Sequence, residues 1–110
     1  KEAIESCKQA VKINPDDADA HYNLGAVYSK SGKYEEAIES YKQAIRIDPD
    51  DAKAHYNLGN AYFKSGKYKE AIESYKQAIR INPDYANAHY NLDVAYGKSG
   101  MNKEAIEAVP

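Results

Sequence analysis

Several residue types are scarce in this sequence. Its 110 residues include one cysteine, one phenylalanine, one methionine and no tryptophan. The single cysteine, Cys7, excludes an internal disulfide and suits a reducing compartment, so a cytoplasmic location is predicted. No apolar run is longer than three residues, too short to cross a membrane. The charged first ten residues lack the apolar stretch of a signal peptide, and the absence of an initiator methionine favours a piece of a longer protein.

Charge gives no sign of a polyanionic partner. Fifteen Lys and Arg residues face 17 Asp and Glu residues, for a net charge of −2, so nothing draws the chain as a whole to nucleic acid or anionic lipid. The 11 tyrosines could stack on bases, but such platforms normally lie in a basic groove. Here the lysines are offset by Asp19 and by aspartates in the turns. We therefore predict neither a nucleic-acid nor a membrane partner.

The chain repeats itself every 34 residues. That step separates three copies of His-Tyr-Asn, beginning at positions 21, 55 and 89, and three prolines, at 15, 49 and 83. Between 18–51 and 52–85, only seven of 34 positions differ. A fixed period of this length is typical of a solenoid. We predict one array, 1–110, made of half a repeat (1–17), two complete repeats (18–51 and 52–85) and an irregular, truncated repeat (86–110).

Apolar residues recur within each repeat at the three- and four-residue spacing of helices. Asp50 and Asp51 are suited to cap the helix over 52–64, Gly66 suits a left-handed residue after its end, and Pro83 stops the helix that follows. No segment alternates with period two, so strands are not expected. The predicted class is all-α, with about seven helices, near 1–13, 18–30, 35–47, 52–64, 69–81, 86–98 and 102–109.

The repeat resembles the tetratricopeptide-repeat (TPR) family over the whole chain. The family's motif positions are occupied by Leu58-Gly59, Tyr62, Ala71, Tyr75, Ala78 and Pro83. The sequence departs from the family in two ways. Histidines 21, 55 and 89 stand where the family often has tryptophan. Asp93 stands at the repeat position that Gly25 and Gly59 hold in the other repeats. The resemblance implies a right-handed superhelix of antiparallel helix pairs. The first helix of each pair would line a concave groove that holds a partner's peptide or helix.

No catalytic or cofactor constellation is evident, so the chain is predicted not to be an enzyme and to carry no cofactor. The three histidines are one repeat apart, too far to share a metal ion, and are expected to fill the tryptophan position between helices. Cys7 falls on an apolar stripe and is interpreted as a small buried hydrophobe. Phosphate-binding glycine motifs are absent.

The groove prediction comes from a helical wheel. Several of the seven differences between the complete repeats fall on one face of the first helix, at 19/53, 26/60 and 29/63, whereas the core positions hardly vary. Asparagines recur there, and each offers a donor and an acceptor. This row is similar to the asparagine ladder of O-GlcNAc transferases. We predict a peptide site, with Val94 as a further apolar spot, formed by Tyr22, Asn23, Lys53, Tyr56, Asn57, Asn60, Phe63, Lys64, Tyr90 and Asn91.

The leading functional prediction is a protein-interaction scaffold, or adaptor, whose groove binds an extended or helical segment of another protein. One alternative is a spacer or self-assembly module that uses its terminal helices. Another is a substrate-selecting region of a larger enzyme. A clamp for the C-terminal carboxylate of chaperones is disfavoured, because its lysine and arginine positions are occupied by Tyr22 or Tyr56 and by Asn91.

Two local predictions accompany this one. The side chain of Asn57 is expected to point to solvent. Asp93 is expected either to be buried at a cost or to hold its neighbouring helix away. The helix over 102–109 has lost both repeat tyrosines and has barely two turns. It is expected to dock loosely, to shift from its repeat position or to pack against another molecule.

Overall fold

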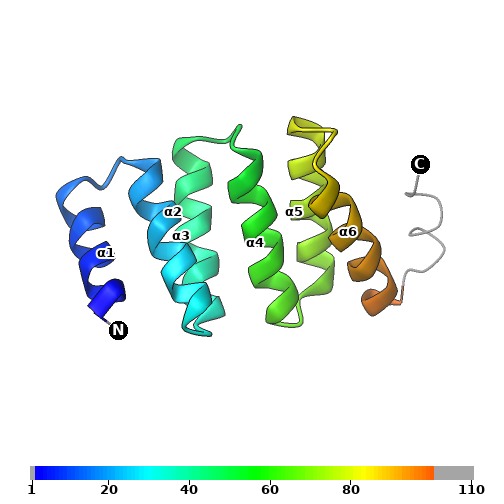
Figure 1. The fold of residues 1–110 in the computed structure, drawn as a ribbon, viewed down its shortest axis with the longest axis horizontal. Coiled ribbons are helices and arrows are strands. Elements are labelled where there is room, and N and C mark those ends of the chain that lie inside the picture. Colours follow the sequence, from blue (N-terminus) through cyan, green and yellow to red (C-terminus); the bar gives the residue numbers. More distant parts are fainter. Residues whose placement is uncertain (1, 101–110) are drawn as a thin grey trace.

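The computed structural model describes residues 2–100, and these form six α-helices in a row (Figure 1). Within this range there are no strands, as predicted. The helices are α1 (Glu2–Ile13), α2 (Ala18–Lys30), α3 (Tyr34–Ile47), α4 (Ala52–Lys64), α5 (Tyr68–Ile81) and α6 (Ala86–Ser99). Their ends agree within one residue with the prediction. The predicted seventh helix, 102–109, lies outside the described residues.

Local chemistry explains the helix ends. Asp17 and Asp51 cap α2 and α4 by accepting hydrogen bonds from the backbone N–H groups of Asp19 and Lys53, each at 3.0 Å. These bonds satisfy donors that a helix start leaves free. Gly66 has a φ of +77°, the left-handed conformation that glycine adopts most easily. The predictions for Asp51 and Gly66 are confirmed.

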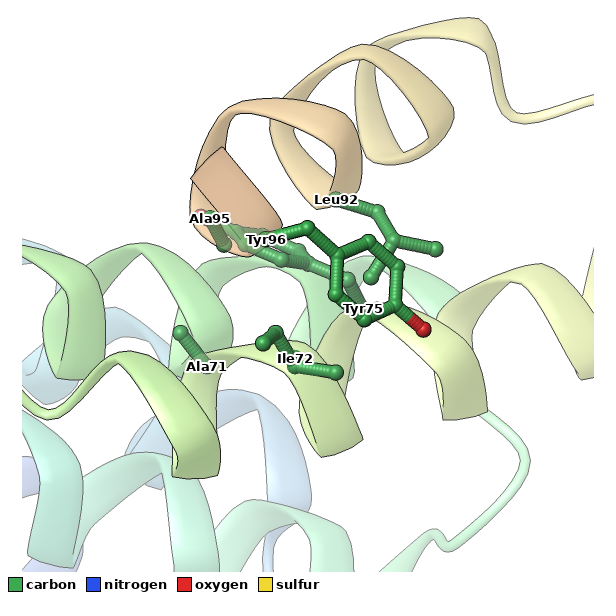
Figure 2. Packing of buried hydrophobic residues seen from close by; sticks show 6 residues of the cluster. All are labelled: Ala71, Ile72, Tyr75, Leu92, Ala95 and Tyr96. Atoms are coloured by element: carbon green, nitrogen blue, oxygen red, sulfur yellow. The ribbon is translucent and has the colours of Figure 1, made fainter. Parts of the chain in front are cut away.

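Each helix packs on the next one in sequence, so the core is a series of layers and not one central cluster. Ala71, Ile72 and Tyr75 of α5 pack against Leu92 and Tyr96 of α6 (Figure 2). A matching cluster joins α3 to α4 through Ala37, Ile38, Tyr41, Leu58 and Ala61. Contacts only between neighbours are the property that defines a solenoid.

The first helix of each pair comes very close to the second. A Cβ atom added to Gly25 would lie 2.8 Å from the ring of Tyr41, and one added to Gly59 would lie 2.7 Å from the ring of Tyr75. No side chain fits in that space, which explains the glycine at this repeat position. Asp93 holds the equivalent place in α6, and it is exposed. Of the two outcomes expected for its carboxylate, burial is not observed among the described residues. Whether it holds back a following helix concerns residues outside the described range.

The three histidines tie the start of one pair to the end of the pair before it. The Nε2 atoms of His21, His55 and His89 lie 2.8, 2.9 and 2.8 Å from the carbonyl oxygens of the prolines at 15, 49 and 83. Since a carbonyl only accepts, each Nε2 carries the proton and donates it. The histidines thus have a structural role at the junctions. Among residues 2–100 no group of three His, Cys, Asp or Glu side chains is placed to hold a metal ion.

Cys7 differs from the expectation of a buried residue, because it is only half-buried. Its repeat equivalents, Tyr41 and Tyr75, are 2% and 1% exposed. They pack under the first helix of their own pair, whereas the described chain holds no helix before α1. No helix within residues 2–100 is long and apolar enough to cross a membrane.

Candidate functional site

The predicted site residues lie on one side of α2, α4 and α6, which we call the groove face. Side chains of four of them are exposed, namely Asn23, Lys53, Lys64 and Tyr90. The other six are half-buried, namely Tyr22, Tyr56, Asn57, Asn60, Phe63 and Asn91. The half-buried ones have contacts both within their own repeat, as for Phe63 with Tyr68, and with a neighbouring repeat, as for Asn57 with Tyr22.

Two hydrogen bonds of the same kind link successive first helices. The Nδ2 atom of Asn57 in α4 donates to the hydroxyl of Tyr22 in α2 at 2.7 Å. One repeat on, Nδ2 of Asn91 in α6 donates to the hydroxyl of Tyr56 in α4 at 3.1 Å. We call these two contacts the rungs. They correct the expectation that the Asn57 side chain points freely to solvent, since its amide nitrogen is held by the preceding repeat.

The rungs fix which half of each amide is left for a ligand. The Nδ2 atom of Asn57 also donates to the backbone carbonyl of Lys53 at 3.1 Å, so both of its hydrogens are used. In the same way Nδ2 of Asn91 donates a second time, to Oδ1 of Asn60 at 3.1 Å. An asparagine amide has two N–H donors and one oxygen acceptor. Asn57 and Asn91 therefore keep Oδ1 as their available group.

Asn60 differs, because its oxygen is engaged and its nitrogen is available. Its Oδ1 accepts from the Tyr75 hydroxyl at 2.6 Å as well as from Asn91. A length of 2.6 Å is typical of O–H···O rather than N–H···O bonds, which supports this orientation of the amide. Burial raises the pKa of Tyr75 well above its usual range, so its hydroxyl stays protonated and able to donate. Asn60 is left with its Nδ2 donors.

Tyr22 and Tyr56, which accept the rung hydrogen bonds, pack against other tyrosines in tilted pairs. The ring centroid of Tyr22 lies 5.7 Å from that of Tyr41, and the ring centroid of Tyr56 lies 5.9 Å from Tyr75 and 4.9 Å from Tyr85. These are favourable separations for tilted aromatic pairs. Burial also raises the pKa of Tyr22 and of Tyr85. The hydroxyls that hold the amides are thus on rings that have little freedom to turn.

A pocket opens beside the second rung, with a volume of about 430 Å³. Five of its seven lining residues belong to the predicted site, namely Asn60, Phe63, Lys64, Tyr90 and Asn91. Val94, expected to be an apolar spot, is the sixth. The structure thus gathers half of the predicted residues around one hollow. Tyr22, Asn23, Lys53, Tyr56 and Asn57 lie elsewhere along the groove face.

Sequence reasoning left two residues out of the site. Tyr75 was expected in the core, and its ring is there, but it also lines the pocket and its hydroxyl orients Asn60. Tyr85 packs against Tyr56 in a tilted pair. A signal for Tyr85 was present, because it replaces the capping aspartate found at Asp17 and Asp51. Replacing a good helix cap with a large aromatic residue sacrifices local stability, which marks the position as one with another role.

Comparison with known proteins establishes the family. A family model of the TPR repeat matches residues 1–32, 28–66 and 59–100. The chain belongs to the TPR repeat family, and the predicted fold is confirmed. No curated protein sequence matches the chain. Repeats of this kind generally serve as scaffolds for protein interaction and are generally not themselves catalytic.

Solved structures share the fold closely. Two crystal structures of MamA superpose with TM-scores of 0.92 and 0.91, at 33% and 35% sequence identity, and the match covers 97% and 96% of this chain. An O-GlcNAc transferase mutant from Thermobaculum terrenum superposes with a TM-score of 0.78 at 35% identity, over 84% of this chain. The matched parts are 58% and 61% of the MamA chains and 18% of the transferase. The chain thus spans about three fifths of the MamA chains and under a fifth of the transferase.

Proposed function

We propose that this chain is a protein-interaction scaffold whose groove face binds an extended segment of a partner protein. One observation carries the proposal: the amides of Asn60 and Asn91 are hydrogen-bonded to each other at 3.1 Å in a way that leaves donors on Asn60 and an acceptor on Asn91. In an extended strand, the N–H and the C=O of one residue point to the same side. Asn60 Nδ2 and Asn91 Oδ1 are suited to take that pair together.

An extended segment fits this arrangement better than a helix does. The backbone N–H and C=O groups inside a helix bond to one another and have nothing to offer an amide. The Oδ1 of Asn57 provides a further acceptor one repeat away. Because the tyrosine hydroxyls already orient the amides, a ligand loses less free energy in ordering them.

The test begins with a library of random peptides selected on the immobilised chain. The dissociation constant of a selected peptide is then measured by fluorescence anisotropy against the wild-type chain and Asn91→Ala. We expect Asn91→Ala to weaken binding roughly 5- to 30-fold, the equivalent of a lost hydrogen bond. The matched control is Gln9→Ala, which removes an exposed amide from α1 and should leave affinity unchanged.

The peptide's backbone provides the second half of the test. Each residue of the selected peptide is replaced in turn by its N-methyl form, which removes one N–H donor. An extended ligand should be sensitive at alternate positions, because only every second N–H faces the groove. Equal affinity of all N-methyl peptides, together with unchanged binding to Asn91→Ala, would show that the groove amides do not hold a peptide backbone.

A second candidate function is that this chain selects substrates for a larger enzyme. The similarity to the Thermobaculum terrenum transferase favours it, since the matched region is 18% of that chain. The groove chemistry proposed above is the same in both cases. Activity of the full-length parent protein, compared with that of a version lacking this array, separates the two.

A further inference from the structure

The pocket beside Asn60 and Asn91 is built from residues that distinguish α4 from α2. Asn60 and Phe63 occupy the places of Ala26 and Ser29, two of the seven differences between the complete repeats. Of the residues around them, Tyr75 and Lys64 have Tyr41 and Lys30 as counterparts, whereas Val94 stands where Asn60 is found one repeat earlier. Within residues 2–100 the pair Asn60 and Phe63 occurs at one place on the groove face, where the hollow can select one position of a bound segment.

Phe63, Val94 and Tyr90 give the pocket apolar and aromatic walls. The Phe63 ring packs edge-on against Tyr68, with centroids 5.1 Å apart and planes at 70°. Val94 is half-buried opposite it, on α6. Tyr90 completes the rim and is 70% exposed, so it offers an uncovered aromatic surface. A volume of about 430 Å³ falls in the range of pockets that hold ligands. This lining suits an apolar side chain.

The rim adds a single cation. Lys64 is exposed, and it forms no ion pair with any of residues 2–100, whereas Lys67 lies 3.8 Å from Glu35. The other six lining residues are neutral. A carboxylate next to the apolar side chain would find its opposite charge here. A terminal carboxylate is held best by several donors and cations together, and one flexible lysine at an open rim is better suited to a side-chain Asp or Glu.

We propose that this pocket selects, within an internal extended segment of the partner, an apolar side chain adjacent to an acidic one. The inference rests on the proposed function, since the amides of Asn60 and Asn91 hold the backbone of the same segment. The pocket then supplies the sequence preference that backbone contacts lack.

The test uses the peptides selected above. We expect Leu, Ile, Met or Phe to be enriched at one position, with Asp or Glu beside it. Phe63→Ser, which installs the residue found at Ser29, should weaken binding about tenfold or more, as expected for one lost apolar anchor. Phe63→Leu should retain most of the affinity, which separates loss of the pocket from loss of the fold.

The acidic position is tested by a cycle of peptide and protein changes. Replacing the peptide's Glu by Gln should weaken binding to the wild-type chain about two- to fivefold, as for an exposed ion pair, and should have no effect on Lys64→Gln. Lys30→Gln, the same change one repeat earlier, is the matched control and should behave as wild type. Amidation of the peptide's C-terminus should change nothing.

Three outcomes would overturn the proposal. If selected peptides show no apolar preference and bind Phe63→Ser as tightly as wild type, the pocket assignment is wrong, although N-methyl sensitivity would still uphold the groove function. If amidation abolishes binding, the carboxylate comes from a chain end and not from an internal residue. If no peptide binds at all, the proposed function and this inference fail together.

Discussion

The helix pairs α2–α3 and α4–α5 have nearly the same sequence, and the comparison separates what the fold requires from what varies. Their cores coincide: Ala37 and Ala71 are both fully buried, and Tyr41 and Tyr75 are 2% and 1% exposed. Their groove faces do not, since only α4 contributes Asn60 and Phe63. The buried positions are thus nearly the same from repeat to repeat, and three of the seven differences, at 19/53, 26/60 and 29/63, fall on the groove face.

Identical residues also acquire different roles according to their neighbours. Asn23 and Asn57 occupy the same repeat position, yet Asn23 is exposed whereas Asn57 is half-buried and bonded to Tyr22. The difference lies in the first helix of the repeat before each of them. For Asn57 that helix is α2, which supplies Tyr22. A repeat position therefore defines a side chain's direction, and the adjacent repeat defines its environment. Three experiments sharpen these comparisons.

The largest effect is expected from exchanging the residues at the close approach of a pair. Gly59→Asp should lower the free energy of unfolding by at least about 3 kcal/mol, because the new Cβ would lie 2.7 Å from Tyr75 and bring a carboxylate into the core. The reverse change, Asp93→Gly, should cost less than about 1 kcal/mol, since Asp93 is exposed. Urea denaturation followed by circular dichroism measures both. Equal effects would contradict the different packing of the two sites.

A smaller effect should distinguish Asn57 from Asn23. Asn57→Ala should lower the free energy of unfolding by about 1–2 kcal/mol, because it removes the rung to Tyr22 and the bond to the Lys53 carbonyl. Asn23→Ala should change it by less than about 0.5 kcal/mol, as is usual for surface positions. Thermal melts of the two variants make the comparison. If the two variants have the same melting temperature, the rung does not stabilise the solenoid.

The smallest effect concerns alkaline pH. Burial raises the pKa of Tyr22, Tyr41, Tyr75 and Tyr85 above the ordinary value of 10.0. Below about pH 10 both the folded and the unfolded chain hold these protons. Above it the unfolded chain releases them first, so the folded state binds more protons and stability falls as pH rises.

Urea midpoints measured between about pH 9 and pH 12 give that slope. Tyr75→Phe should flatten it most, since burial raises the pKa of Tyr75 furthest among the four. The exposed Tyr90→Phe is its matched control. An unchanged slope in Tyr75→Phe would contradict the burial of that hydroxyl.

Most of the fold could be predicted from the sequence, because it follows from local rules. The three- and four-residue spacing of alanines, Leu58 and Ile72 places the helices, Asp51 caps one of them, and Gly66 ends it. The rungs could not be predicted in this way. A helical wheel puts Asn57 on an outer face, but whether Tyr22 reaches it depends on the rotation between successive repeats, which no single helix determines.

The candidate site shows the same limit. The wheel identified Asn60, Phe63 and Asn91 because variable and polar residues gather on one face. It assigned Tyr75 to the core, because a helical wheel gives each side chain one direction and therefore one environment. A tyrosine is long enough to have a buried ring and a hydroxyl at the groove, and the bond from that hydroxyl to Asn60 determines which half of the amide remains available.

The reach of the rungs has a mechanical consequence. Each joins residues only 35 positions apart, so within residues 2–100 no rung connects the first helix to the last. Such a molecule deforms as a spring does, by a small rotation at each junction, and its stiffness is set by the weakest junction. A segment lying across both rungs would link three first helices at once. Binding in the groove would then change the pitch and the elasticity of the solenoid.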